Sequence, residues 1–336
     1  MCSCINILGD NGFFGRNMDL DHSFNEKVII TPRNYIIKFK KEKQIENHYA
    51  FIGIGTIIDD YPLYAEASNE KGLSIANLNF KNLAKYHPYD KEKKNYAIYE
   101  ICLLLLSKCK NVKEAKKMLK DVNVLSVSFN ENTPLTDLHI MVSDSKESIV
   151  IETDECGFNI YDNVFNVLTN NPNFPYHRYN VSNYMSLDNN EIKNSINPKV
   201  NLNKYSLGLS SFGLPGDYSS TSRFVRAFFN KSKVVFPEDN KERIITYFKL
   251  LDSVSIIKGC VKTSNGYHYS RYASCFSYND KSFYYKTYYS NEIVKINMFN
   301  KDLSQNKLIA IELREKVEFT EENNWKSYRY FVFFFL

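Results

Sequence analysis

Cys2 is the residue of this chain whose position offers the clearest chemistry. Met1 precedes a small residue and is therefore expected to be removed after synthesis, which leaves Cys2 at the N-terminus. A terminal cysteine carries a thiol nucleophile and an α-amine that can move protons within one residue. Modest effects of neighbouring groups can then make the thiolate the reactive form. Because many chains carry a cysteine at this position without any role, the residues around Cys2 decide the interpretation.

A predicted hairpin brings two charged residues back to the start of the chain. Residues 3–19 read as two strands joined by the turn 9–12, whose sequence is Gly-Asp-Asn-Gly. Antiparallel pairing then places Arg16 and Asp19 near Cys2. In that position Arg16 could stabilise a thiolate, and Asp19 could hold an α-ammonium group. A structural ion pair at the end of a strand explains the same spacing equally well.

The rest of the sequence predicts groups of strands that alternate with groups of helices. Strands are expected at 28–31, 35–39, 50–57, 73–79, 138–142, 148–153, 158–161 and 164–169, and again between about 266 and 311. Helices are expected at 96–108, from 111 to about 119, at about 220–229 and at about 241–251, and loops at 171–204 and 208–217. This order shows no βαβ alternation and no linker. It predicts an α+β domain of two sheets covered by helix pairs.

Composition restricts the class of protein. The chain has 336 residues, enough for one large domain or two ordinary ones, and its 43% hydrophobic and 24% charged residues are typical of a folded protein. Aromatic residues reach 15%, which favours a sheet-rich structure. The net charge of +5 is spread over short lysine runs that acidic residues interrupt, so nucleic acid is not an expected partner. No segment resembles a signal peptide, and the apolar end 331–336 is too short to span a bilayer. We therefore expect a cytosolic protein without a membrane partner.

The cysteines and histidines predict neither a metal site nor a disulfide framework. Seven cysteines are scattered along the chain without a CxxC pair, and six histidines lack a ligand spacing such as HxxxH. We therefore expect the histidines to be structural or surface residues. Cys4 lies two residues after Cys2, so the two thiols are expected on the same face of the strand.

Several segments of the chain resemble one enzyme family. The matching segments occur in family order over residues 1 to about 300, at 1–2, 14–19, 23–25, 55–62, 69–73, 78–80, 168–170, 213–217 and 222–224. They resemble the choloylglycine hydrolase family, which contains bile salt hydrolases and penicillin V acylases. The resemblance implies an N-terminal nucleophile hydrolase with a four-layer αββα fold, in which two antiparallel sheets pack between helix layers. It also implies a single domain over 1–336. The end of the chain, from about 314, is a divergent tail whose apolar terminus we expect to be buried or paired.

The same resemblance gives roles to individual residues. It implies that the catalytic residues are Cys2, Arg16, Asp19, Asn79, Asn170 and Arg223. Asn170 would donate its side-chain amide to an oxyanion, and Asn79 would position the N-terminus and the substrate. By sequence alone, Asn170 would be an ordinary turn residue and Arg223 a surface cation at the start of a helix.

The implied reaction is hydrolysis of an N-acyl amide through a thioester on Cys2, without a metal or an organic cofactor. Asn79 and the segment 59–62 resemble the bile salt branch, so the expected substrate is a conjugated bile salt cleaved between the bile acid and glycine or taurine. The residues that could line an apolar pocket for a steroid are Met18, Leu20, Ile58, Tyr61 and Phe80, which would equally suit a core.

Two other functions remain open. The first is a penicillin V acylase, or another N-acyl amide hydrolase of the same family. The second is a member kept as a non-catalytic binding protein, against which the intact catalytic set argues. The resemblance also implies a homotetramer.

Overall fold

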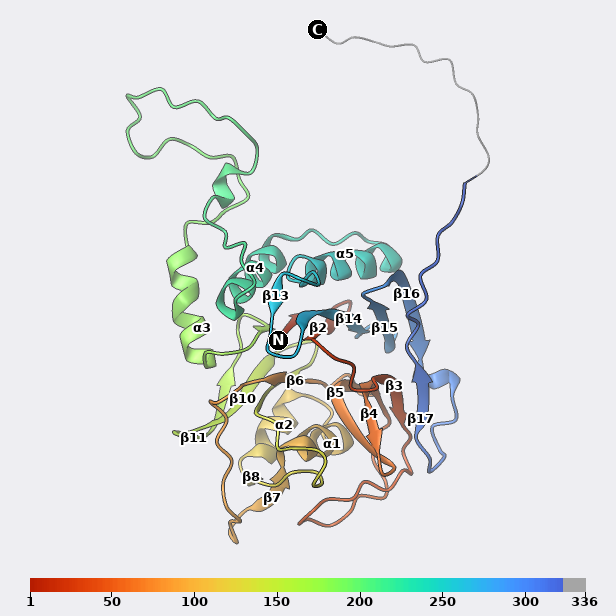
Figure 1. Ribbon diagram of the computed structural model, residues 1–336. Helices are drawn as coiled ribbons and strands as arrows, with labels where there is room; N and C mark the ends of the chain where they lie inside the picture. The colour runs from red at the N-terminus through yellow and green to blue at the C-terminus, as the bar shows by residue number, and fades with distance from the viewer. Residues whose placement is uncertain (323–336) are drawn as a thin grey trace.

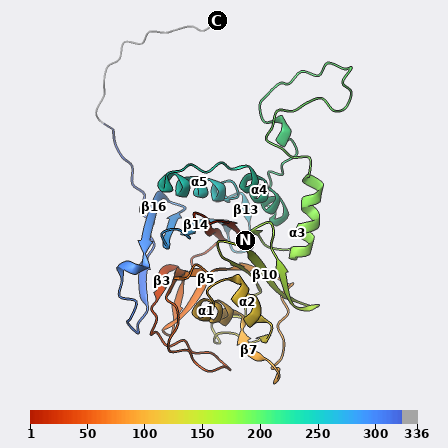
Figure 2. The same ribbon diagram turned by 180° about the vertical axis from the view of Figure 1, so that it is seen from behind.

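The structure is a computed structural model that describes residues 1–322, and its elements form four layers. Two antiparallel sheets face each other in the middle of the molecule (Figure 1). Helices α4 (Ser220–Lys233) and α5 (Asn240–Asp252) cover the outer face of the first sheet. Helices α1 (Ile98–Lys108) and α2 (Val112–Leu119) cover the second sheet, and Figure 2 shows the same layering from behind. The predicted αββα arrangement is confirmed.

The first sheet contains the start of the chain. Its strand order is β12-β1-β2-β14-β15-β16, with β13 paired to β14. The strands are β1 (Cys2–Ile7), β2 (Phe13–Leu20), β12 (Val167–Leu168), β13 (Val261–Lys262), β14 (Tyr267–Ser277), β15 (Ser282–Thr287) and β16 (Ser290–Asn297). Because β1 lies between β2 and β12, the chain start adjoins both its predicted hairpin partner and the strand that leads to Asn170.

The second sheet has the strand order β11-β10-β9-β6-β5-β4-β3-β17. Its strands are β3 (Lys27–Thr31), β4 (Phe51–Ile58), β5 (Tyr61–Asn69), β6 (Ser74–Asn79), β9 (Leu138–Ser143), β10 (Ser148–Asp154), β11 (Gly157–Asp162) and β17 (Ile309–Glu312). A separate parallel pair consists of β7 (Lys94–Ala97) and β8 (Val122–Leu125). Helix α3 (Phe174–Val181) follows β12, and short 3₁₀ turns occur at Ser182–Tyr184, Leu209–Ser211 and Met298–Asn300.

Two clusters of buried apolar side chains hold the layers together. One fills the space between the sheets and beneath α4 and α5, and it includes Phe14, Ile54 and Phe248. The other lies between the second sheet and α1, and it includes Ile75 and Leu103. Full burial of one such side chain contributes roughly 1.5–3 kcal/mol. Since interiors of this kind are close-packed, the sheets form a rigid frame for the residues near Cys2.

Two strand predictions in the first part of the chain differ from the structure. The strand predicted at 35–39 is wrong, because Ile37 makes only an isolated bridge with Ile45. Strand β5 was not predicted, although it pairs with β4 along its whole length. The turn between these strands consists of Asp59 and Asp60, with φ angles of 52° and 57°, so a tight hairpin forms here without glycine.

Other differences lie around the helices. The segment predicted as a loop at 171–204 contains α3, whose first turn is capped by the Asn173 side chain and includes Pro175. The strand predicted at 164–169 is reduced to β12, because Asn166 has a φ of 54° and interrupts the extended backbone. The helix predicted at 96–108 begins only at Ile98, because the two residues before it belong to β7.

Within residues 1–322, no helix combines the length and the apolar character needed to cross a membrane. The divergent tail from about 314 begins against the first sheet, where the Arg314 carbonyl accepts a hydrogen bond from the Thr287 hydroxyl at 2.9 Å. The apolar terminus at 331–336, predicted to be buried or paired, lies outside the described residues.

Candidate active site around Cys2

The register of the β1–β2 hairpin places Cys2 opposite Met18 and Cys4 opposite Arg16. Side chains of directly opposed residues lie on the same face of a sheet, so these four side chains face the space between the sheets. Cys2 is almost fully buried, and its Sγ lies 4.0 Å from the Met18 Sδ. Burial raises the pKa of the Cys4 thiol far above its usual value, so this second thiol stays protonated. The expectation that the two thiols share one face is confirmed.

Arg16 supplies a buried cation on the same face. Its Nη1 donates to the carbonyls of Asn77 at 2.6 Å and Ala65 at 3.1 Å, and its Nη2 lies 3.5 Å from the Met18 Sδ. Burial would lower the pKa of Arg16, but the charges of Cys2 and Glu66 outweigh it and raise the pKa above its usual value. A guanidinium held in this way can stabilise a thiolate at Cys2.

Asn170 contacts the main chain of Cys2 through its side-chain oxygen. The Cys2 backbone nitrogen donates to Asn170 Oδ1 at 2.7 Å. Met1 is present in the structure, so this nitrogen is a peptide nitrogen at the position that the free α-amine would occupy after removal of Met1. Asn170 Nδ2 donates to the Asn79 carbonyl at 2.9 Å. An amide carries two N–H donors, so the second can serve an oxyanion.

Arg223, in the first turn of α4, binds the chain start from the opposite face of the first sheet. Its Nη1 donates to the Cys2 carbonyl at 2.5 Å and to the Ser3 hydroxyl at 2.6 Å. Its Nη2 donates to Asn170 Oδ1 at 2.9 Å, and its Nε donates to the Tyr218 carbonyl at 3.1 Å. The planar fork of the guanidinium therefore fixes Cys2 and Asn170 relative to each other. The surface cation expected from sequence alone is instead fully buried.

Asp19 has one carboxylate oxygen that is satisfied and one that is not. Oδ1 accepts a hydrogen bond from the Ser270 hydroxyl at 2.6 Å. Oδ2 is buried without a hydrogen-bond partner among the described residues, and Arg223 Nη1 lies 3.9 Å from it. The Asp19 backbone N–H donates to the Met1 carbonyl at 3.0 Å. Because an unpaired buried carboxylate oxygen is costly, Oδ2 is suited to bind an α-ammonium group created by removal of Met1.

Two buried histidines support the backbone around Asn170, so the expected structural role is confirmed for these two, although their partners were not predicted. His177 Nε2 lies 2.8 Å from the Asn170 carbonyl and therefore donates to it. His139 Nε2 lies 3.0 Å from the Thr169 carbonyl, and its Nδ1 lies 3.0 Å from Glu152 Oε1. Burial lowers the pKa of His177 to about 4, so its ring is neutral near pH 7. No spacing pattern links these residues, which come from different elements, so the sequence held no signal for the network.

Asn79 lies at the end of β6, as predicted, but its side chain is exposed. Its Oδ1 accepts from the Lys81 backbone N–H at 3.2 Å, and its contact with Asn170 runs through the backbone carbonyl. The neighbouring Phe80 is fully buried and stacks on His139, with ring centroids 4.6 Å apart. Of the two interpretations that the sequence left open for Phe80, this position favours the core.

The other proposed pocket residues are less buried. Met18 lies beside Cys2, and Leu20 packs at the margin of the core between the sheets. Ile58 and Tyr61 face each other across the hairpin that joins β4 to β5. The Tyr61 ring packs against Phe129 with centroids 5.3 Å apart. Met18 and Leu20 thus adjoin the cluster between the sheets, whereas Tyr61 packs against the cluster between the second sheet and α1.

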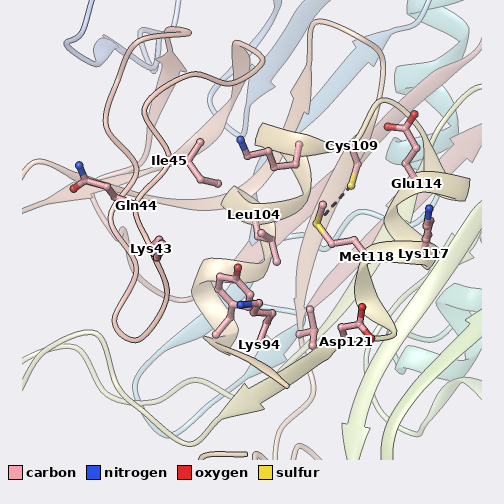
Figure 3. A pocket seen from close by; sticks show the side chains of 13 residues that line it. Lys43, Gln44, Ile45, Lys94, Leu104, Cys109, Glu114, Lys117, Met118 and Asp121 are labelled. Carbon is pink, nitrogen blue, oxygen red and sulfur yellow. Dashed lines mark hydrogen bonds between the residues drawn. The ribbon is translucent and has the colours of Figure 1, made fainter. Parts of the chain in front are cut away.

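A cavity of about 690 Å³ lies elsewhere, between α1, α2 and the segment 43–45 (Figure 3). Leu104, Met118 and Cys109 line its apolar part, and lysines such as Lys117 lie at its rim. Burial raises the pKa of the Cys109 thiol to about 12, so this cysteine stays protonated. The cavity shares no lining residue with the Cys2 centre and offers no comparable nucleophile.

Comparison with known proteins identifies the family. Residues 2–311 match the family described as linear amide C-N hydrolases, choloylglycine hydrolase family. The chain is 42% identical over 324 residues to a bile salt hydrolase/transferase of Lactiplantibacillus plantarum, and the match covers 96% of this chain and 100% of that protein. A crystal structure of a variant of conjugated bile acid hydrolase from Clostridium perfringens matches with a TM-score of 0.88 and 33% identity, over 96% of this chain and 100% of that one. Penicillin V acylase from Agrobacterium tumefaciens shares the fold, with a TM-score of 0.72 and 18% identity over 93% of this chain and 91% of that one. The chain therefore belongs to the choloylglycine hydrolase family of linear amide C-N hydrolases.

Proposed function

We propose that this enzyme hydrolyses conjugated bile salts at the amide bond between the bile acid and glycine or taurine. The observation that carries the proposal is the setting of Cys2, whose backbone nitrogen and carbonyl are bound by Asn170 and Arg223 while its thiol shares a face with Arg16. This arrangement matches the needs of a terminal thiol nucleophile. The bile salt substrate is supported by the full-length similarity to proteins named bile salt hydrolase/transferase and conjugated bile acid hydrolase.

Acylation uses the residues at both faces of the first sheet. After removal of Met1, the Cys2 thiolate attacks the amide carbonyl carbon, and a C–S bond forms while the carbonyl oxygen gains negative charge. Asn170 Nδ2 donates to that oxyanion, and Arg16 faces the thiolate before attack. The C–N bond then breaks, and the α-ammonium of Cys2, held by Asp19 Oδ2, gives its proton to the leaving glycine or taurine nitrogen.

Deacylation returns the enzyme to its starting state. The α-amine, now neutral, accepts a proton from a water molecule as its oxygen attacks the thioester carbonyl. The C–S bond breaks, the thiolate is released, and the bile acid leaves with a new C–O bond. The proposal uses neither a metal nor an organic cofactor in either half of the reaction.

The acyl group of the substrate is proposed to contact Met18, Leu20, Ile58 and Tyr61. Met18 supports this placement because its Sδ lies 4.0 Å from the Cys2 Sγ, next to the position of a bound acyl carbon. Apolar side chains of this kind suit a steroid skeleton. We also propose Asn79 as a positioning residue and Phe80 as a pocket residue, although Phe80 is fully buried.

The first test is the release of glycine and taurine from glycocholate and taurocholate by the purified protein, with the N-terminus verified by intact mass. We expect release by the protein that begins at Cys2 and its loss in Cys2→Ala. Cys4→Ala is the matched control, because it removes a buried thiol two residues away and should retain activity. Activity in Cys2→Ala would contradict the thiol mechanism. No release by the processed protein would contradict the bile salt assignment, and hydrolysis of penicillin V would then favour the acylase alternative.

Two further proposals concern the whole protein. We propose a homotetramer, supported by a segment at 185–212 whose apolar side chains include Leu207 and Phe212, which are 100% and 82% exposed. We also propose that the protein works in the cytosol, where reducing conditions would preserve the Cys2 thiol.

A further inference from the structure

Glu66 is a buried acid beside the active-site arginine that the reaction described above does not use. It belongs to β5 of the second sheet, and it is 1% exposed. Its Oε2 lies 3.7 Å from Arg16 Nε and accepts a hydrogen bond from the Tyr272 hydroxyl at 3.0 Å. Its Oε1 is buried without a hydrogen-bond partner among the described residues. The carboxyl group therefore bridges the two sheets at Arg16 and keeps one oxygen free to take a proton.

Arg16 thus lies between two groups that can each carry a negative charge. On one side is Glu66, and on the other is Cys2, which shares the strand face of Arg16. Cys2 and Arg16 lie close together, because the Met18 Sδ is 4.0 Å from the Cys2 Sγ and 3.5 Å from Arg16 Nη2. One buried guanidinium cannot fully compensate two buried anions, because each anion weakens the field available to the other.

We propose that Glu66 is a positioning residue that controls the nucleophile through Arg16: an ionised Glu66 competes with the Cys2 thiolate for the same guanidinium and holds thiolate formation back, whereas a neutral Glu66 permits it. The inference rests on the proposed function in that it takes Cys2 as the nucleophile. It adds a buried carboxyl group from the second sheet to the groups around Cys2.

The groups that face Glu66 come from several elements. They are Arg16 on β2, Tyr272 and Ser274 on β14, Cys4 on β1 and Cys102 on α1. Burial raises the pKa of the Cys4 and Cys102 thiols, so both thiols stay neutral. Arg16 is then the charged group that faces Glu66. Burial also raises the pKa of Glu66 to about 7, although Arg16 and the hydroxyls of Ser274 and Tyr272 oppose it. The proton on Glu66 is therefore gained and lost near pH 7.

The test measures the rate at which iodoacetamide alkylates Cys2 between pH 5 and pH 9, followed by mass spectrometry of the N-terminal peptide. In the unmodified protein we expect a broad profile with two steps, because ionisation of Glu66 interrupts the gain of thiolate. In Glu66→Gln we expect a single step, displaced to lower pH by about one unit. The acidic limb of the pH profile for substrate hydrolysis should move in the same direction.

Glu100→Gln is the matched control. Glu100 is another buried carboxyl whose pKa burial raises to about 7, but it accepts hydrogen bonds from the backbone of Ala97 and Lys40 at the start of α1. This variant should leave the Cys2 alkylation profile unchanged. An equal shift in the control would show that any change of buried charge has the effect, and it would overturn the proposal.

Tyr272→Phe provides a second route if Glu66→Gln does not fold. It removes the hydroxyl that stabilises the Glu66 carboxylate, so Glu66 holds its proton to higher pH and the alkylation profile shifts in the same direction, by a smaller amount. Unchanged profiles in both variants would overturn the proposal. Because alkylation needs no substrate, a shifted profile in a protein that does not cleave bile salts would sink the substrate assignment and leave the role of Glu66 intact.

Discussion

The Asn170 side chain links Cys2 to two other residues of the site. Its Oδ1 binds both the Cys2 nitrogen and Arg223, while its Nδ2 reaches the Asn79 carbonyl. The side chain therefore combines two tasks, since it anchors the terminal residue and offers a donor to an oxyanion. A shorter side chain would lose both.

Replacing Asn170 by alanine should reduce turnover of the bile salt substrate by about 10²–10³-fold, the usual cost of losing one oxyanion donor. The measurement is steady-state hydrolysis of glycocholate at saturating concentration. Asn171→Ala is the control, because Asn171 is the next residue and its Nδ2 only donates to the Lys81 carbonyl at the surface. Equal losses in the two variants would indicate damage to the turn instead of a lost donor.

At the residue scale, the sequence predicted contacts between residues that lie close together along the chain, but it did not predict contacts between distant residues. The hairpin placed Arg16 and Asp19 beside Cys2 from the sequence alone, because a short turn fixes the register of two adjacent strands. Glu66 gave no such signal. Its contact with Arg16 joins two different sheets, so it exists only once the sheets have packed.

At the scale of elements, the turn from Thr169 to α3 shows the same limit. Sequence predicted a strand followed by a loop, and the resemblance supplied Asn170. The sequence did not predict helix α3, which supports Asn170, because α3 has few apolar residues and contains Pro175, so its apolar residues show little periodicity. In the structure, His177 on α3 donates to the Asn170 carbonyl and stacks on Phe224 of α4. The helix is thus held by contacts that only the tertiary structure provides.

The buried ring of His177 should make the stability of this region depend on pH. Burial lowers its pKa to about 4 from an ordinary 6.5, so the unfolded chain binds a proton over this range while the folded chain does not. The contribution of the neutral His177 ring to the free energy of unfolding is therefore fully present above about pH 6.5. It is lost as the pH falls towards 4, and the loss is about 3 kcal/mol in total. Urea unfolding at several pH values measures this slope.

His177→Gln separates this effect from that of other titrating groups. Glutamine keeps a donor for the Asn170 carbonyl but has no proton to gain in this range. We expect the free energy of unfolding of the variant to fall less between pH 6.5 and pH 4 than that of the unmodified protein, by about 3 kcal/mol. Parallel slopes would mean that His177 can be protonated in the folded state.

At the scale of the whole molecule, the layer order was predictable and some strand pairings were not. Alternating groups of strands and helices predicted two sheets covered by helix pairs. However, β17 pairs with β3 across most of the chain length, and β5 follows a turn in which two aspartates adopt the positive φ angles that usually favour glycine. Pairing between distant segments depends on which faces remain uncovered after packing, and a local pattern does not contain that information.

The segment 185–212 departs most from this compact arrangement. It projects from the layers beyond α3 and α4 (Figure 1). Ile196, Leu207 and Phe212 are 88%, 100% and 82% exposed within it. Apolar side chains gathered on one projecting segment are typical of an interface between protein chains. A second copy of the same protein could bury these side chains, and the proposed homotetramer requires such self-association.

Replacing these three residues by serine should therefore lower the molar mass in solution, measured by size-exclusion chromatography with light scattering. We expect a tetramer for the unmodified protein and a smaller species for the triple variant, with far-ultraviolet circular dichroism unchanged because the segment lies outside both cores. Val164→Ser and Val235→Ser are the controls, since both valines are exposed, at 70% and 86%, but lie elsewhere. A monomeric unmodified protein, or a triple variant of unchanged mass, would show that the segment does not join the subunits. The apolar side chains would then need another explanation, because each one left in water forgoes the burial energy of roughly 1.5–3 kcal/mol that a contact would provide.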